Sequence, residues 1–235
     1  MLPNEIIEDL INEHVKDNFV VSFGTGKFMN IFVSKLALKV EQENLNVKVV
    51  PTSQHMNELL HDLGLEVSSL EDKEIDVAFD FVDMVDENFN YISLDSTSLV
   101  RDKMIAQSAE TMIIIVPQSG FVKNLKDRVL FEISTFGYKR TLIQLMNLGI
   151  PTLKKQGNKP IKTESGNYIV EVLVDEIHDI EDLEFQSKNI PGVLESGLFL
   201  DYADKIVLHN GSVKVKTRVN NSNSNIDKSD SILEI

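Results

Sequence analysis

Residues 19–40 indicate the class of fold, because a strand, a glycine-containing turn and a helix follow one another there. The stretch opens with Phe19-Val20-Val21-Ser22-Phe23, a short apolar run that is typical of a strand, and Gly24-Thr25-Gly26 ends it. From position 28 to Val40 the apolar residues recur at helical spacing. One strand–helix unit of this kind predicts an α/β fold if the unit is repeated along the chain.

The unit is repeated over the first 127 residues. The apolar pattern predicts further strands and helices, at 47–50, 75–79 and 112–116 for the strands and at 4–16, 54–64 and 98–109 for the helices. Strands that alternate with helices, some of them uninterrupted apolar runs, indicate a parallel sheet covered on both faces. We therefore expect a Rossmann-like α/β domain.

A different order of elements follows. Strand, helix and strand occur twice in succession, at 129–134, 138–148, 151–156, 168–174, 180–189 and 195–200. This βαβ-βαβ order is that of a ferredoxin-like α+β unit. Two short apolar runs at 206–208 and 213–215 then predict a hairpin that returns to the first domain.

These patterns predict three parts of the chain. Residues 1–127 together with 204–219 are expected to form the α/β domain, and residues 128–203 the smaller ferredoxin-like α+β domain. The polar segment 220–235 shows no periodicity and is expected to be a disordered tail.

Composition excludes several classes of function. The 235 residues include 23 Lys and Arg against 37 Asp and Glu, a formal net charge of −14. This acidity argues against nucleic acid and against an anionic membrane surface, since both attract clustered cations. Without Cys there are no thiolate ligands, and the five His show no metal-ligand spacing. No long apolar run or signal-like N-terminus is present, so we expect a soluble cytoplasmic protein without a bound metal.

The loop Gly24-Thr25-Gly26-Lys27 is the first candidate site. It lies between a strand and a helix, where backbone N–H groups and the helix dipole bind anions. It is neither a Walker A loop nor a dinucleotide fingerprint, because Phe28 and Met29 occupy the positions of the Ser or Thr and of the third glycine. The loop is therefore either a tight turn or a cradle for a phosphate or a sugar.

Carboxylates form the second candidate site. Asp80 and Asp83 follow the strand at 75–79, where open α/β sheets bind ligands. They suit acid–base chemistry, sugar hydroxyls or a hard metal ion, or they belong to a solvated acidic loop. Asp102, in the first turn of the 98–109 helix, is either a dipole-stabilising residue or a base directed into the same cleft. Thr52 and Ser53 are either hydroxyl donors to that cleft or helix caps.

In their order along the chain, these motifs resemble the ribose-5-phosphate isomerase A family over about residues 5–219. Gly24-Thr25-Gly26 is similar to the family's GTGST loop, Asp80-x-x-Asp83 to DGADE, and Leu99-x-Arg101-Asp102-Lys103 to LxREK. The segment from Pro191-Gly192-Val193 to Phe199, with Ala203-Asp204, resembles the end of the family's lid.

The resemblance implies a fold, a reaction and a set of site residues. The fold is an α/β domain with a ferredoxin-like lid, and the reaction interconverts ribose 5-phosphate and ribulose 5-phosphate through a cis-enediolate. It uses no metal or cofactor, and the family's proteins are oligomers, so a homodimer is expected. By position, Asp102 would be the base, and Asp80 and Asp83 would act on the ring oxygen and hydroxyls. The substrate-binding set implied with them is Thr25, Gly26, Lys27, Thr52, Ser53, Ser93 and Ser96.

The chain also departs from the family pattern. The family's KGGG loop is replaced by Ser93-Leu94-Asp95-Ser96, its ASK lysine falls on Gly120, and the Glu of REK is shortened to Asp102. Lys27 is expected to supply a cation to the phosphate instead, and a Lys27→Ala variant with unchanged sugar-phosphate binding would contradict this. Three functions stay open: isomerisation of ribose 5-phosphate, binding or regulation without catalysis, and isomerisation of a different sugar.

Overall fold

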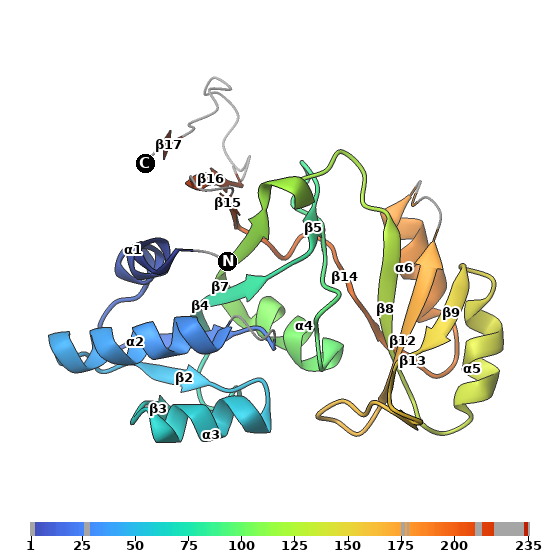
Figure 1. Ribbon diagram of the computed structural model, residues 1–235, viewed down its shortest axis with the longest axis horizontal. Coiled ribbons are helices and arrows are strands. Elements are labelled where there is room, and N and C mark those ends of the chain that lie inside the picture. The colour runs from blue at the N-terminus through green and yellow to red at the C-terminus, as the bar shows by residue number, and fades with distance from the viewer. Residues whose placement is uncertain are drawn as a thin grey trace.

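The computed structural model describes residues 3–25, 29–174, 177, 179–209, 213–218 and 233–234. An eight-stranded main sheet and a smaller four-stranded sheet lie side by side in Figure 1. The expected disordered tail falls outside the described residues, except that Leu233–Glu234 pairs as strand β17 with β16. The fold is α/β with a ferredoxin-like α+β unit, as the sequence predicts.

The main sheet has the strand order β17-β16-β15-β7-β4-β1-β2-β3. Every neighbouring pair from β3 to β15 is parallel, and the last two strands are antiparallel. The strands are β1 (Val20–Phe23), β2 (Lys48–Val50), β3 (Glu66–Val67), β4 (Ile75–Phe81), β7 (Ala109–Pro117), β15 (Lys205–His209), β16 (Val213–Thr217) and β17. The chain builds outward from β1 to β3 and then resumes at β4 on the other side of β1. The switch point, where such sheets bind ligands, therefore lies between β1 and β4.

Helices cover both faces of the main sheet. Those of one face are α1 (Asn4–His14), α2 (Met29–Glu43) and α3 (Gln54–Asp62), which share a buried cluster with Phe23, Phe79 and Ile113 of the strands. On the other face, α4 (Leu99–Ser108) packs against Ala78 and Ile114. Alternate residues of β4 and β7 thus enter opposite cores, as the nearly uninterrupted apolar runs predict.

The ferredoxin-like unit, called the lid below, is an antiparallel sheet of order β13-β8-β12-β9. Its elements are β8 (Asp127–Ile133), α5 (Tyr138–Leu145), β9 (Ile150–Leu153), β12 (Tyr168–Val174), α6 (Ile180–Lys188) and β13 (Val193–Ser196). Both helices contribute to one buried cluster with Phe131, Val170 and Val172 of the sheet. A hairpin of β10 (Lys155–Gln156) and β11 (Lys159–Pro160) extends from this unit.

The sequence predicts one strand over 195–200, and this prediction is wrong. The strand breaks at Gly197, and β14 (Leu198–Phe199) joins a separate small sheet with β6 (Tyr91–Ile92) and β5 (Met84–Val85). A Cβ on Gly197 would lie 3.0 Å from the Ser93 carbonyl oxygen and 3.4 Å from Leu130. Glycine therefore permits the chain to pass between the lid and the loop that follows β6. A 3₁₀ turn, η1 (Gln118–Gly120), follows β7.

Candidate functional site

The candidate site lies at the carboxyl ends of β1 and β4. Thr25 follows β1, Asp80 is near the end of β4, and Asp102 is in the first turn of α4. Asp80 and Asp102 are both only 4% exposed. Ser96, in the loop before α4, completes the group with its buried hydroxyl. Residues that are separated widely in the sequence thus converge at the switch point.

The two oxygens of the Asp102 carboxylate are in different surroundings. Oδ2 accepts hydrogen bonds from the Thr25 hydroxyl at 2.9 Å and from the Ser96 hydroxyl at 2.6 Å. Oδ1 is buried and has no hydrogen-bond partner among the described residues. The carboxylate is therefore oriented through Oδ2, and Oδ1 keeps its lone pairs for another group.

The electrostatic environment makes Asp102 a weaker acid than usual. Burial is the main cause that raises the pKa of Asp102, to about 6, and the negative charge of Glu132 adds to it. The hydrogen bonds from Ser96 and Thr25 act in the opposite direction. A carboxylate with this pKa is ionised at pH 7 and is still basic enough to accept a proton from carbon.

The pKa of Asp80 is raised more strongly than that of Asp102. Burial, followed by the charge of Asp102, raises the pKa of Asp80 well above its usual range, although a hydrogen bond from the Phe81 backbone lowers it in part. Two neighbouring carboxyl groups of this kind do not both ionise, and such a pair suits acid–base chemistry, with one group as the acid and the other as the base. In this pair, Asp80 suits the role of the acid and Asp102 that of the base.

Asp83 lies beside this pair, but its carboxylate binds a backbone N–H group. Its Oδ2 accepts a hydrogen bond of 2.7 Å from the Leu94 N–H and so holds the loop that ends at Ser96. Burial raises the pKa of Asp83, while the Leu94 N–H and the charge of Lys154 lower it. Ser93, in the same loop, is buried, and its N–H donates to the Gly197 carbonyl oxygen at 3.3 Å.

The hydroxyls of Thr52 and Ser53 are engaged outside the group. The buried Thr52 hydroxyl donates to the Phe23 carbonyl oxygen at 3.0 Å, and Ser53 caps α3 by accepting from the Met56 N–H at 3.0 Å. The structure thus brings together Thr25, Asp80, Ser96 and Asp102 of the expected set. Gly26 and Lys27 lie outside the described residues.

Ser53→Ala tests the capping role. Loss of an N-cap side chain costs about 1 kcal/mol of folding free energy. For a chain of this size, that corresponds to a fall of about 2–4 °C in Tm. Calorimetry measures the shift, with Ser165→Ala as the control, at an exposed turn serine whose side chain makes no hydrogen bond among the described residues. A Tm equal to that of the unmodified protein would contradict the cap.

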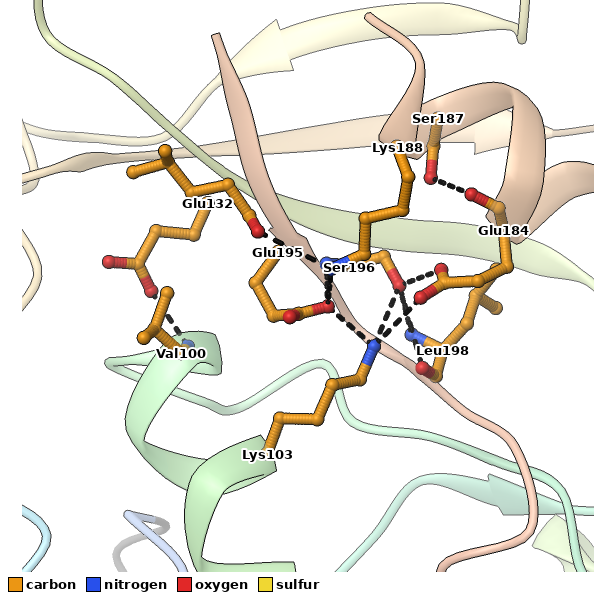
Figure 2. Close-up of polar contacts among 10 residues, drawn as sticks. Val100, Lys103, Glu132, Glu184, Ser187, Lys188, Glu195, Ser196 and Leu198 are labelled. Atoms are coloured by element: carbon orange, nitrogen blue, oxygen red, sulfur yellow. Dashed lines mark hydrogen bonds and ion pairs between the residues drawn. The ribbon is translucent and has the colours of Figure 1, made fainter. Parts of the chain in front are cut away.

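Two charged residues next to the site have no role predicted from the sequence: Lys103, which is quoted above only as part of a motif, and Glu132. Lys103 of α4 is buried, and its Nζ lies 3.0 Å from Glu184 Oε1 and 2.6 Å from Glu195 Oε1, both in the lid (Figure 2). Although burial acts to raise it, the positive charge of Lys103 keeps the pKa of Glu195 below its usual value. The sequence does contain one feature that indicates this burial: Lys103 comes four residues after Leu99 and therefore lies on the buried face of the helix.

Glu132 of β8 is fully buried and faces α4. Its signal is a lone carboxylate inside the apolar run 129–133, where an unpaired charge would be unfavourable. Among the described residues, no group of three or more His, Cys, Asp or Glu could hold a metal ion. No helix in the same residues is long and apolar enough to cross a membrane.

Comparisons with known proteins identify the family of the chain. The family model for ribose 5-phosphate isomerase A (phosphoriboisomerase A) matches residues 48–212. Ribose-5-phosphate isomerase A of Prochlorococcus marinus subsp. pastoris is 34% identical over 213 residues, which cover 87% of this chain and 92% of that protein. Human ribose-5-phosphate isomerase is 31% identical over 220 residues, covering 88% and 70%.

Solved structures show the same relationship. Ribose 5-phosphate isomerase A from Methanocaldococcus jannaschii superimposes with a TM-score of 0.84 at 26% identity, covering 92% of this chain and 97% of that one. A D-ribose-5-phosphate isomerase in complex with phospho-erythronic acid gives the same TM-score and coverage at 29% identity. The chain belongs to the ribose 5-phosphate isomerase A family.

Proposed function

We propose that the protein interconverts ribose 5-phosphate and ribulose 5-phosphate. The observation that carries the proposal is the buried pair of Asp80 and Asp102, whose pKa values are both raised and of which Asp102 keeps one oxygen unpartnered among the described residues. Relatives of the same family carry this activity in their names, and one related structure holds a phosphorylated sugar acid. Both support a sugar phosphate as the substrate.

The reaction would need only proton transfers and shifts of electron pairs. Asp102 Oδ1 removes the proton from C2 of the open-chain aldose, and the C2–H electron pair forms the C1–C2 double bond of a cis-enediol. The protonated Asp80 donates to the carbonyl oxygen on C1 as that oxygen gains electrons. Asp102 then returns its proton to C1, while the hydroxyl on C2 loses its proton to Asp80 and becomes the ketone.

The active form is proposed to be a homodimer in the cytoplasm, as the family resemblance implies. Light scattering of the purified protein measures the molar mass directly. A monomer mass over the working concentration range would contradict the dimer.

The activity is tested by incubating the purified protein with ribose 5-phosphate and measuring the ketopentose formed. Turnover that requires Asp102 supports the proposal. Thermal unfolding is followed in parallel with ribose 5-phosphate and with ribose. Stabilisation by the phosphate without turnover would identify a binding protein instead, and stabilisation by the unphosphorylated sugar alone would identify a different substrate.

Ser96→Ala tests how the pKa of Asp102 is set. The Ser96 hydroxyl stabilises the ionised carboxylate, so its removal raises the pKa of Asp102 further. Because the base must be ionised, the acid limb of the kcat/KM profile should move to higher pH, and the rate on that limb should fall by the same factor as the acid dissociation constant of Asp102. The profile is measured from pH 5 to 8 with Ser69→Ala, at an exposed loop serine, as the control. An unmoved acid limb would show that this hydrogen bond does not tune the base.

A further inference from the structure

The N-terminus of α4 is capped by a residue of the lid. Ser98 occupies the N-cap position, yet its side chain makes no capping hydrogen bond, and its Oγ has no partner among the described residues. The Val100 N–H, in the first turn, instead donates to Glu132 Oε2 at 3.1 Å. A carboxylate at this place satisfies a free N–H group and is favoured by the helix dipole. Figure 2 shows this contact between Glu132 of β8 and Val100 at the start of α4.

Glu132 is itself held firmly in place. Its side chain is fully buried, and Oε1 accepts hydrogen bonds from the Thr163 hydroxyl at 2.8 Å and from the Asn167 amide at 2.9 Å. Among the described residues no Lys or Arg forms an ion pair with it, so these donors and the helix terminus compensate its charge. The geometry of the cap is therefore fixed by the lid.

Asp102 stands in the same helical turn. Its N–H donates to the Ser98 carbonyl oxygen at 3.0 Å, so the turn that Glu132 caps is the turn that carries the base. The next residue, Lys103, is bound to Glu184 and Glu195 of the lid, as Figure 2 shows. The start of α4 is thus attached to the lid through three of its residues, since Arg101 also lies 3.7 Å from Glu164 of the lid.

The titratable groups around Asp102 come from four elements. Asp80 faces it from β4, Glu132 from β8 and the buried Tyr91 from β6, and Arg101 and Lys103 are its neighbours on α4. Arg101 donates to the Thr52 carbonyl oxygen and forms an ion pair with Glu164, whereas Lys103 forms ion pairs with Glu184 and Glu195 of the lid. The charge of Glu132 acts to raise the pKa of Asp102.

We propose that Glu132 is a positioning residue for the isomerase reaction, which caps α4 from the lid and thereby fixes the Asp102 carboxylate at its working position. This role rests on the proposed function, and it assigns the lid a direct part in setting up the base. Glu132 itself does not contact the substrate.

Glu132→Gln and Glu132→Ala separate the charge from the cap. Glutamine keeps the size and an oxygen that accepts from the Val100 N–H but removes the charge, so the pKa of Asp102 should fall and the acid limb of kcat/KM should move to lower pH. Alanine removes the cap as well, and kcat should fall about 10- to 100-fold with little change in KM, since a misplacement of about 1 Å can have this effect. Recovery of most of kcat in the glutamine variant is expected.

The matched control is Glu171→Gln. Ile169 of β12 pairs with Glu132, and Glu171, two residues further along the strand, lies on the same face of the lid sheet. Glu171 forms its ion pair with Arg128, at 3.5 Å, and not with α4. Its removal should leave both the pH profile and kcat unchanged. An equal shift of the acid limb in this control would overturn the proposal, because the effect would then be one of general charge.

The titration of Asp102 is also followed without turnover, by carbon NMR of aspartate-labelled protein with Asp102→Asn to assign the signal. A lower midpoint in Glu132→Gln supports the close contact between Glu132 and the turn of Asp102, on which the positioning role depends, and an unchanged midpoint overturns it. If the unmodified protein shows no isomerase activity while this midpoint moves, the proposed function fails but the coupling between Glu132 and Asp102 stands. If Glu132→Ala does not fold, the glutamine variant still decides.

Discussion

Asp102→Asn is expected to lower kcat for ribose 5-phosphate about 10³-fold, within the range of about 10²–10⁴ that general base catalysis contributes. Asparagine has nearly the same shape, and its amide oxygen can still accept hydrogen bonds from Thr25 and Ser96 at the position of Oδ2. The amide nitrogen then occupies the position of Oδ1, where it has no lone pair with which to accept the C2 proton. KM should change little, because the shape of the site is retained.

The measurement is initial-rate kinetics for the unmodified protein and the variant, beside Asp62→Asn, an exposed aspartate at the end of α3, as the control. Thermal unfolding accompanies the kinetics. Because the substitution removes a buried carboxylate with a raised pKa, Tm should not fall, and the lost activity then reflects lost chemistry. A variant with more than about a tenth of the original kcat would exclude Asp102 as the base.

Gly24→Ala is expected to lower kcat about 100-fold, although residue 24 carries no chemistry. A Cβ at this position would lie 2.9 Å from Asp80 Oδ2 and would overlap Oδ1 and Cγ of the same carboxylate. The Gly24 N–H also donates to the Phe79 carbonyl oxygen at 2.9 Å, so the backbone cannot move away without losing this bond. The side chain of Asp80 must therefore move away from its place beside Asp102.

A double-mutant cycle checks this route of action. In an Asp80→Ala background the overlapping atoms are gone, so Gly24→Ala should have little further effect on kcat. Additive losses in the double variant would show that Gly24 acts by some other route. Initial rates for the four proteins of the cycle, with Tm for each, provide the comparison.

Local sequence patterns were sufficient for the α/β and ferredoxin-like parts and for the place of Asp80, whereas for Asp102 they left two interpretations open and the family resemblance indicated the base. Apolar runs such as 112–116 identify buried strands, and a carboxylate directly after such a strand must lie at the ligand-binding edge of a parallel sheet. Local patterns do not predict the break at Gly197, because it depends on packing against Ser93 and Leu130, which are distant in the sequence.

The roles of individual side chains were harder to predict than their places. Thr52 and Ser53 follow a strand end just as Thr25 does, yet their hydroxyls are used for a backbone contact and a helix cap. Glu132 and Lys103 act across the boundary between the main sheet and the lid, and no local periodicity encodes a contact between two such units. Such contacts depend on the pairing of β6 with β14, which joins the two units.

That pairing has a consequence for cooperativity. β14 leaves the lid and pairs with β6, and the ring of Phe199 stacks on that of Tyr91 with centroids 4.5 Å apart. Ile92 and Leu198 of the same two strands lie in the buried cluster of the lid, so detachment of the lid would expose these two apolar side chains to water. Opening of the lid is therefore opposed by these buried apolar contacts as well as by the polar contacts of α4, and we expect the base and its cap to be lost together or kept together.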